Sequence, residues 1–409
     1  MYLLTTFIFF LICIEVATTH PLCIDFPEPD DLSRHTYTPC PVVHHALNRR
    51  QNAFNANNAF NFHLNCNASQ ELCVKVERGF TRVGEILSTY YFNFTAPIRV
   101  NASFYEFCKV EPGKHTACAS DGMASQIGYA SAARGILMTD DDAVSRIYPQ
   151  ALVKQFQLNP QPGYHEYDIN CNFNAELKWK FESSPEEPGE ISFEHIVLHE
   201  LLHGLGFQTY WRKYSTAVSH NFLYPIGISL VNHSMTNIYT SNFEGALDRY
   251  LMVVPKMIHA TEYTKQIDAA ARILFSRNTT SREFFNAVES APEFQPARDM
   301  LNYSQTRDAL ALLPYGGKAP DDFIFMESSI IPYKAGASLS HLCLEKYGKS
   351  ADRLMIASQQ DPNNMPLLVP DVNGQGGSIG PLVLRAMASI GYLTKQQLPT
   401  PPIPKLVTI

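Results

Sequence analysis

Hydrophobic positions along this chain follow two rhythms, one helical and one extended. Residues 74–91 carry apolar side chains three and four positions apart, which predicts an amphipathic helix. Residues 97–107 and 167–173 instead alternate apolar and polar side chains, as half-buried strands do. The apolar face of the predicted helix consists of Phe80, Val83, Ile86 and Leu87.

A third apolar stretch, residues 193–205, has hydrophobic side chains on several faces, which is typical of a buried helix. Ser192 is a suitable N-cap, because its hydroxyl can accept a hydrogen bond from a free N–H of the first turn. Gly206 lets the chain leave the helix sharply, because glycine tolerates positive φ.

Residues 208–335 are expected to form a mostly helical insertion, with helices near 243–251, 263–275 and 282–288. A further helix is expected over 379–392. Together the elements predict an α+β fold. Its main domain covers 76–395, preceded by a Pro- and Asn-rich segment over 20–75 and followed by a Pro-rich, extended tail over 396–409.

The first 19 residues are predicted to be a signal peptide, because the apolar run from Tyr2 to Ile14 is short and small residues follow it. A buried N-terminal strand or helix is the alternative. No other stretch predicts an integral membrane segment. The segment 20–75 is a possible propeptide, since Arg49-Arg50 could be a processing site; an ordinary exposed basic pair is the favoured explanation of these residues.

Composition supports secretion and excludes some partners. The formal charge of −7 argues against binding nucleic acid or an anionic membrane. Of the nine cysteines, Cys13 lies in the predicted signal, and the even number left suits disulfides in an oxidising compartment. The chain also has several N-x-S/T sequons, which indicate a secreted glycoprotein: Asn67, Asn93, Asn101, Asn232, Asn278 and Asn302.

Candidate chemistry is concentrated in the run from His199 to Phe207, which reads H-E-x-x-H-x-x-G-F. Residues four apart lie on one face of a helix, so His199 and His203 can present two imidazoles to one Zn²⁺ ion. Glu200 can reach a metal-activated water as a general base without being a ligand itself. A core helix with two hydrogen-bonded histidines is the alternative. It is disfavoured because burying these polar groups without a function costs several kcal/mol.

A catalytic zinc needs three protein ligands and one open position. The compact form of the motif requires a third histidine at position 209, where this chain has Thr209. His195 shares the face of His199 and is expected to be an outer-shell or surface residue. The third ligand must therefore come from elsewhere, and the candidates are His220, His233, His259, His341, Glu244 and Asp248.

The stretches Gly336-Ala-Ser-Leu-Ser-His341 and Ala351-Asp-Arg-Leu-Met355 resemble the second half of the active site in leishmanolysin-like metzincins. In that family a long insertion separates the zinc helix from a third histidine, which a Met-turn follows. The resemblance covers about 76–207 and 330–393, with Leu342 where the family has Trp.

This resemblance implies a zincin or metzincin catalytic domain, a twisted mixed sheet with an active-site helix. It also implies that the strand over 167–173, which precedes this helix, forms the substrate-binding edge of the sheet. His341 would be the third ligand, Met355 the Met-turn residue, and Asp248 the fallback ligand. The alternatives are a surface or core role for His341 and ordinary core packing for Met355.

The expected function is therefore that of a secreted, extracellular zinc endopeptidase that acts on proteins or peptides. Two alternatives stay open. One is a non-catalytic secreted zinc-binding glycoprotein, against which the intact Glu200 argues. The other is a zinc hydrolase that acts on something other than peptides. The sequence predicts no oligomeric state.

Overall fold

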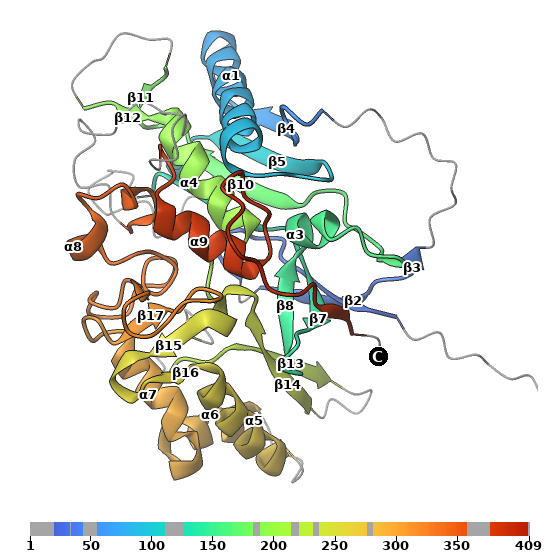
Figure 1. The fold of residues 1–409 in the computed structure, drawn as a ribbon, viewed down its shortest axis with the longest axis vertical. Helices are drawn as coiled ribbons and strands as arrows, with labels where there is room; N and C mark the ends of the chain where they lie inside the picture. The colour runs from blue at the N-terminus through green and yellow to red at the C-terminus, as the bar shows by residue number, and fades with distance from the viewer. Residues whose placement is uncertain are drawn as a thin grey trace, which may run out of the picture.

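The computed structural model describes residues 20–32, 34–43, 55–110, 126–182, 189–213, 221–231, 237–275, 281–357 and 377–407. Residues 1–19, expected to be a signal peptide, lie outside these ranges. So do the possible processing site Arg49-Arg50, the sequons at Asn232 and Asn278, and the candidate ligands His220 and His233. The described residues form an α+β fold with mixed sheets and several helices (Figure 1).

A sheet with the strand order β4-β5-β10-β6 carries the candidate site. The strands β4, β5 and β10 are parallel, and β6 is antiparallel to β10. The bounds of these strands are Phe60–Cys66 for β4, Ile98–Tyr105 for β5, Gly128–Ala132 for β6 and Ile169–Asn174 for β10. In β5 every second residue is buried, so one face of the sheet packs against helices and the other is half-exposed.

Two helices cover the buried face of this sheet: α1 (Gln70–Ile86) and α4 (Phe193–Leu205) (Figure 1). The helix predicted over 74–91 is confirmed; it begins earlier, after the N-cap Ser69, and its last turn, Leu87–Tyr91, is a π-helix. Both predicted strands are also confirmed as β5 and β10. However, β10 lies inside the sheet, and the edge strand beside α4 is β6. The expectation of an edge strand over 167–173 was wrong.

A second sheet, of order β13-β14-β8-β7-β1-β2 with β19 added to β7, lies beside the first. It includes strands from both ends of the described chain, and Cys23 of β1 is disulfide-bonded to Cys40. The strands are β1 (Leu22–Asp25), β2 (Thr36–Pro39), β7 (Arg134–Thr139), β8 (Ser145–Pro149), β13 (Ile226–Val231), β14 (Asn237–Gly245) and β19 (Lys405–Leu406).

The described residues before the boundary expected at residue 75 pair with strands that follow it. The strand β1 is largely buried between β7 and β2, while β4 belongs to the sheet that carries the candidate site. Residues 20–43 and 55–75 are integral parts of the fold, because their removal would expose the neighbouring strands.

The insertion over 208–335 is mixed rather than mostly helical, which corrects the sequence expectation. Its helices are α5 (Thr261–Phe275), α6 (Ser281–Ser290) and α7 (Gln295–Tyr303), and the first two confirm the helices expected at 263–275 and 282–288. They pack beside a sheet of order β16-β15-β17-β18 (Figure 1). Its strands are β15 (Leu251–Val253), β16 (Ile258–His259), β17 (Leu310–Leu312) and β18 (Ile324–Phe325).

The expectation of a helix over 243–251 is wrong. The end of β14, the 3-10 turn Leu247–Tyr250 and the start of β15 occupy those positions. The carboxylate of Asp248 accepts hydrogen bonds from the backbone N–H groups of Gly245 and Tyr210, at 2.7 and 2.8 Å. The turn is therefore stabilised in part by Tyr210, a residue outside the segment 243–251.

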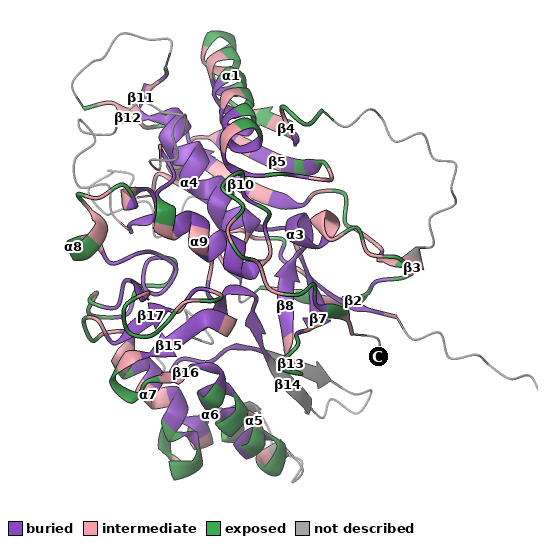
Figure 2. Cartoon of the chain, in the orientation of Figure 1, coloured by how far each residue is buried: buried purple, intermediate pink, exposed green. Residues whose placement is uncertain are grey.

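The helix expected over 379–392 is α9 (Pro381–Ile390), and Figure 2 shows that it and α4 are largely buried. No helix among the described residues is both long and apolar enough to cross a bilayer. Shorter elements complete the described fold: α2 (Phe107–Val110), α3 (Gln150–Gln155), α8 (Leu344–Tyr347), β3 (Val42–Val43), β9 (Gln161–Pro162), β11 (Trp179–Lys180), β12 (Ile191–Ser192), and 3-10 turns over Val254–Lys256, Pro292–Phe294 and Arg353–Met355.

Candidate metal centre

The helix α4 is capped as the sequence predicts. The hydroxyl of Ser192 accepts a hydrogen bond from the N–H of His195, and Gly206 ends the helix with φ = 115°. Every residue of α4 is buried. A side chain at Gly204 would overlap Ile169 of β10, so glycine allows the helix to lie directly on the sheet. The helix is therefore held rigidly, which fixes the positions of the side chains that it carries.

Three histidines converge on one point. The Nε2 atoms of His199, His203 and His341 lie 3.1 to 3.2 Å from one another. Two come from α4, and His341 comes from a segment 138 residues beyond His203. Within the described residues, these three form the group of side chains that could hold a metal ion.

The opposite nitrogen of each ring contacts a backbone carbonyl. The Nδ1 atom of His199 lies 2.6 Å from the oxygen of Leu354, that of His203 lies 2.8 Å from Phe207, and that of His341 lies 3.1 Å from Ala337. A carbonyl oxygen can only accept, so each Nδ1 carries the proton and each neutral ring has a bare Nε2.

The short Nε2–Nε2 distances therefore cannot be hydrogen bonds between neutral rings, because no proton lies between them. Three lone pairs that point at one another repel unless a cation sits among them. In a tetrahedral zinc site with Zn–N distances of about 2.0–2.1 Å, ligand atoms are about 3.3–3.4 Å apart. The observed triangle is close to that size, so the donor set fits a small divalent cation.

Burial keeps these rings neutral. It lowers the pKa of His199 to about 4, and the pKa of His203 to about 3 with a further contribution from the charge of His199. The pKa of His341 is well below its usual value, first through burial and then through the two other rings. A metal ion binds neutral imidazole, so the site needs little or no deprotonation near neutral pH.

Glu200 follows the first ligand on α4. Burial raises the pKa of its carboxyl group to about 8, against the opposing effect of a hydrogen bond from the backbone N–H of Ala130 in β6. Glu200 and the three histidines are each 7% exposed, so none is fully closed off from solvent. The arrangement places a basic carboxylate between the metal ligands and the edge strand β6.

His341 is held in the site by the backbone contacts of its neighbour Leu342. Leu342 forms bridges to Met326 on one side and to Ile356 on the other. Its N–H donates to the carbonyl of Met355 at 2.6 Å. Met355 is fully buried in the turn Arg353–Met355, next to Leu354, the hydrogen-bond partner of His199. His341 is thus held between the end of the insertion and the turn Arg353–Met355.

Asp352 joins this turn to α9. Its Oδ1 atom accepts hydrogen bonds from the N–H groups of Leu382 and Val383, at 2.8 and 3.2 Å. The N-cap position Gly380 has no side chain to do this, and a Cβ there would overlap Asp352. A distant carboxylate therefore caps α9 and anchors the turn that carries Leu354 and Met355.

The other candidate ligands among the described residues lie apart from the cluster. Asp248 supports the corner after β14, and His259 is exposed. The carboxylate of Glu244 accepts from Arg146, Thr261 and Thr264 in a buried network. Thr209 is buried, with its hydroxyl unpartnered.

His195 is also buried, with both ring nitrogens unpartnered and a pKa lowered to about 3, chiefly by burial. It is therefore not a surface residue, contrary to one of the two roles expected for it.

The cysteines and sequons are placed in several environments. Cys66 is bonded to Cys73, Cys108 is disulfide-bonded, and Cys171 and Cys343 are free and buried. Asn67, Asn93 and Asn302 are exposed. Asn101 is half-buried in β5, where its side-chain nitrogen donates to the side-chain oxygen Oδ1 of Asn170 at 3.2 Å.

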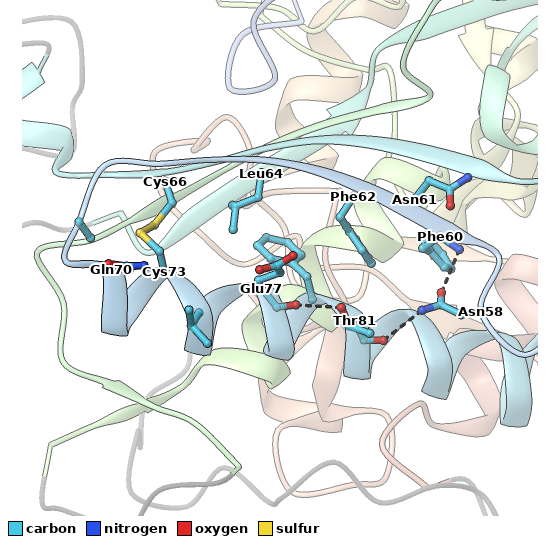
Figure 3. Close-up of a pocket in the computed structure, with 13 residues that line it drawn as sticks. Asn58, Phe60, Asn61, Phe62, Leu64, Cys66, Gln70, Cys73, Glu77 and Thr81 are labelled. Carbon is cyan, nitrogen blue, oxygen red and sulfur yellow. Dashed lines mark hydrogen bonds between the residues drawn. A yellow bond between two sulfur atoms is a disulfide. The ribbon is translucent and has the colours of Figure 1, made fainter.

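A separate hollow of about 810 Å³ lies between β4 and α1. Figure 3 shows Phe62 and Leu64 of the strand and Glu77 and Thr81 of the helix along it. Because β4 and β6 are opposite edges of the same sheet, this hollow does not belong to the histidine cluster.

Residues 23–407 match the protein family described as SPBPB7E8-like. The chain is similar to the uncharacterized protein PB7E8.01 of Schizosaccharomyces pombe, with 26% identity over 371 residues. The match covers 82% of this chain and 63% of that protein, so the chain spans less than two thirds of its relative. No solved structure matches the chain.

Proposed function

The chain belongs to the SPBPB7E8-like family, and we propose that it is a secreted, zinc-dependent endopeptidase. The observation that carries the proposal is the convergence of three unprotonated Nε2 atoms within 3.2 Å, beside the carboxylate of Glu200. Such a set of lone pairs is stable only around a cation, and three ligands leave a fourth position for water or substrate.

His199, His203 and His341 would hold the ion through Nε2, each oriented by its Nδ1 hydrogen bond to a backbone carbonyl. When bound, zinc would polarise the scissile carbonyl and make a water nucleophilic near neutral pH. Glu200 would take the proton from this water and give it to the nitrogen of the leaving amine. Burial makes the carboxylate a stronger base than an exposed one, because it raises the pKa to about 8.

An extended peptide has a place to bind beside these groups. Among the described strands β6 pairs only with β10, so its outer edge can accept another strand. Ala130, whose N–H contacts Glu200, lies in this edge strand. A substrate added to β6 would therefore run past the general base and the metal ligands.

The proposed likeness to leishmanolysin-like metzincins is supported by the path of the chain. The third histidine follows a long insertion and lies next to the turn with Met355, in the order that the resemblance implies. The proposed secretion is supported by the disulfides Cys23–Cys40 and Cys66–Cys73, since such bonds persist in oxidising compartments.

The proposal is tested with Glu200→Gln, purified with zinc and assayed on a denatured, fluorescently labelled protein. Loss of the general base is expected to reduce turnover by at least about 10²-fold. Zinc content should equal that of the wild type. Glu194→Gln is the matched control, because Glu194 is a buried glutamate of the same helix that contacts the N–H of Glu182 instead.

Wild-type turnover in zinc-loaded Glu200→Gln would refute this mechanism. A wild type that binds zinc without cleaving any protein would point to the non-catalytic zinc-binding glycoprotein or to a hydrolase with another substrate.

A further inference from the structure

Glu327 lies just beyond β18 and is 2% exposed. Its backbone contacts the third-ligand segment twice. The N–H of Glu327 donates to the carbonyl of His341 at 2.7 Å, and the carbonyl of Glu327 accepts from the N–H of Leu339 at 2.9 Å. The segment near the end of the insertion is therefore hydrogen-bonded directly to the segment that contains His341.

The side chain of Glu327 extends this contact. One carboxylate oxygen, Oε2, accepts from the N–H of Leu344 at 3.0 Å. The other, Oε1, accepts from the N–H and the hydroxyl of Ser329 at 2.9 and 2.6 Å. Backbone and side chain together hold the segment on both sides of His341.

The segment needs such support because it has little regular structure of its own. Gly336 has φ = 78° and Leu339 has φ = 66°, a left-handed conformation that is unfavourable for leucine. The ring of His341 is oriented by Ala337, a residue of the same segment. The position of its Nε2 atom therefore depends on how firmly the whole segment is held.

We propose that Glu327 is the positioning residue of His341, and that its carboxylate is retained in the interior to fix the third metal ligand. A buried carboxylate is costly unless it is fully hydrogen-bonded. Only a carboxylate can accept on both oxygens, whereas the amide of glutamine offers one acceptor and one donor. The inference rests on the metal site of the proposed function, but not on peptidase activity.

The test measures metal binding to the full-length protein by competition with a chromophoric chelator, together with the visible d–d absorption of Co²⁺ at the same site. Glu327→Ala is expected to weaken zinc binding by about 10- to 100-fold, the usual effect of losing a residue that orients a ligand. Its Co²⁺ spectrum is expected to change, because the coordination geometry loosens. Glu327→Gln keeps one acceptor and should fall between Glu327→Ala and the wild type.

The matched control is Asp168→Asn. Asp168 is also fully buried, and it accepts from the N–H of Arg99 at 2.7 Å and from Lys154 at 2.8 Å, away from the third ligand. It is expected to lose stability while zinc affinity and the Co²⁺ spectrum stay at wild-type values. An equal loss of affinity in Asp168→Asn would overturn the inference, since the effect would then be general destabilisation.

Wild-type affinity and spectrum in both Glu327 variants would also overturn it, with the proposed function intact. If Glu327→Ala does not fold, Glu327→Gln alone decides between these outcomes. A wild-type protein that binds neither ion would instead refute the metal site itself, which is a failure of the proposed function.

Discussion

The Nδ1 atom of His199 donates a hydrogen bond of 2.6 Å to the carbonyl oxygen of Leu354, across 155 residues of sequence. This bond fixes the proton on Nδ1 and so leaves Nε2 free for a metal ion. It also ties the helix that carries two ligands to the turn that supports the third. Each part of the site therefore orients another.

The third ligand can be tested against its fallback. His341→Ala is expected to lower zinc affinity by more than the roughly 10- to 100-fold typical of outer-shell changes, because it removes a donor atom. Asp248→Ala should leave zinc affinity unchanged. It should reduce the free energy of unfolding by about 1–3 kcal/mol, since two buried N–H groups lose their acceptor. Zinc retained by His341→Ala and lost by Asp248→Ala would reverse the assignment.

Replacing Asp352 should lower the free energy of unfolding, and the loss should be larger the fewer hydrogen bonds the new side chain can accept. Asp352→Ala leaves the N–H groups of Leu382 and Val383 without a partner, which is expected to cost about 1–3 kcal/mol. Asp352→Asn keeps an acceptor oxygen and should cost less. Asp322→Asn is the control, because its partly exposed ion pair with Arg385 of α9 is screened by solvent and contributes little to stability. Urea unfolding measures all three, and equal losses would contradict the capping role.

Glu200 should give the metal-free protein a distinctive pH dependence. Its pKa is about 8 in the folded protein and 4.5 in the reference state, so the folded state holds this proton more tightly. Its contribution to stability is therefore full below about pH 4.5 and is lost as the pH rises through about 8. Glu200→Gln cannot ionise and lacks this loss.

The test compares urea unfolding of the two metal-free proteins at about pH 5 and about pH 9. The variant should become the more stable of the two at the higher pH. His199 and His203 act in the opposite direction and at lower pH, because their lowered pKa values cost stability as the pH falls below about 6.5. Both proteins share that effect, so parallel profiles would refute the role of Glu200.

Glycosylation should be selective among the sequons that the structure describes. Asn67 and Asn302 are exposed, whereas the side-chain nitrogens of Asn93 and Asn101, which would carry a glycan, are hydrogen-bonded to the carbonyl oxygen of Thr394 and the side-chain oxygen of Asn170. Replacing Asn67 or Asn302 by Gln should increase the gel mobility of the protein when it is expressed through a secretory pathway. Asn101→Gln should not, and a shift with this variant would show that the folded structure does not govern use of the site.

Two of the three clustered histidines and the neighbouring glutamate could be placed together from the sequence because their relationship is local. His199, Glu200 and His203 lie within one turn of one helix, and helical periodicity alone brings them together. His341 required elimination of Thr209 and a resemblance to a family, since no local pattern places a residue 138 positions away.

Glu327 and Asp352 were not predicted, and no sequence signal marks them. Both act by accepting hydrogen bonds from backbone N–H groups of other segments, and a backbone group leaves no trace in the residue pattern. The same dependence on residues distant in sequence explains why some expectations about the fold were wrong. The position of β10 within the sheet depends on its neighbours, and the spacing of Leu247, Tyr250 and Leu251 suits a helix as well as a turn.

The ladder of Met326, Leu342 and Ile356, and the cap that Asp352 places on α9, also set an order of events during synthesis. A ribosome releases His199 and His203 long before their third partner. The turn with Leu354 is secured only when α9, which ends at Ile390, has emerged. A nascent chain, or one truncated before His341, thus carries His199 and His203 without His341 and without the contact of Leu354 to the ring of His199. The proposed peptidase activity would therefore arise only after α9 has emerged and Asp352 has capped it.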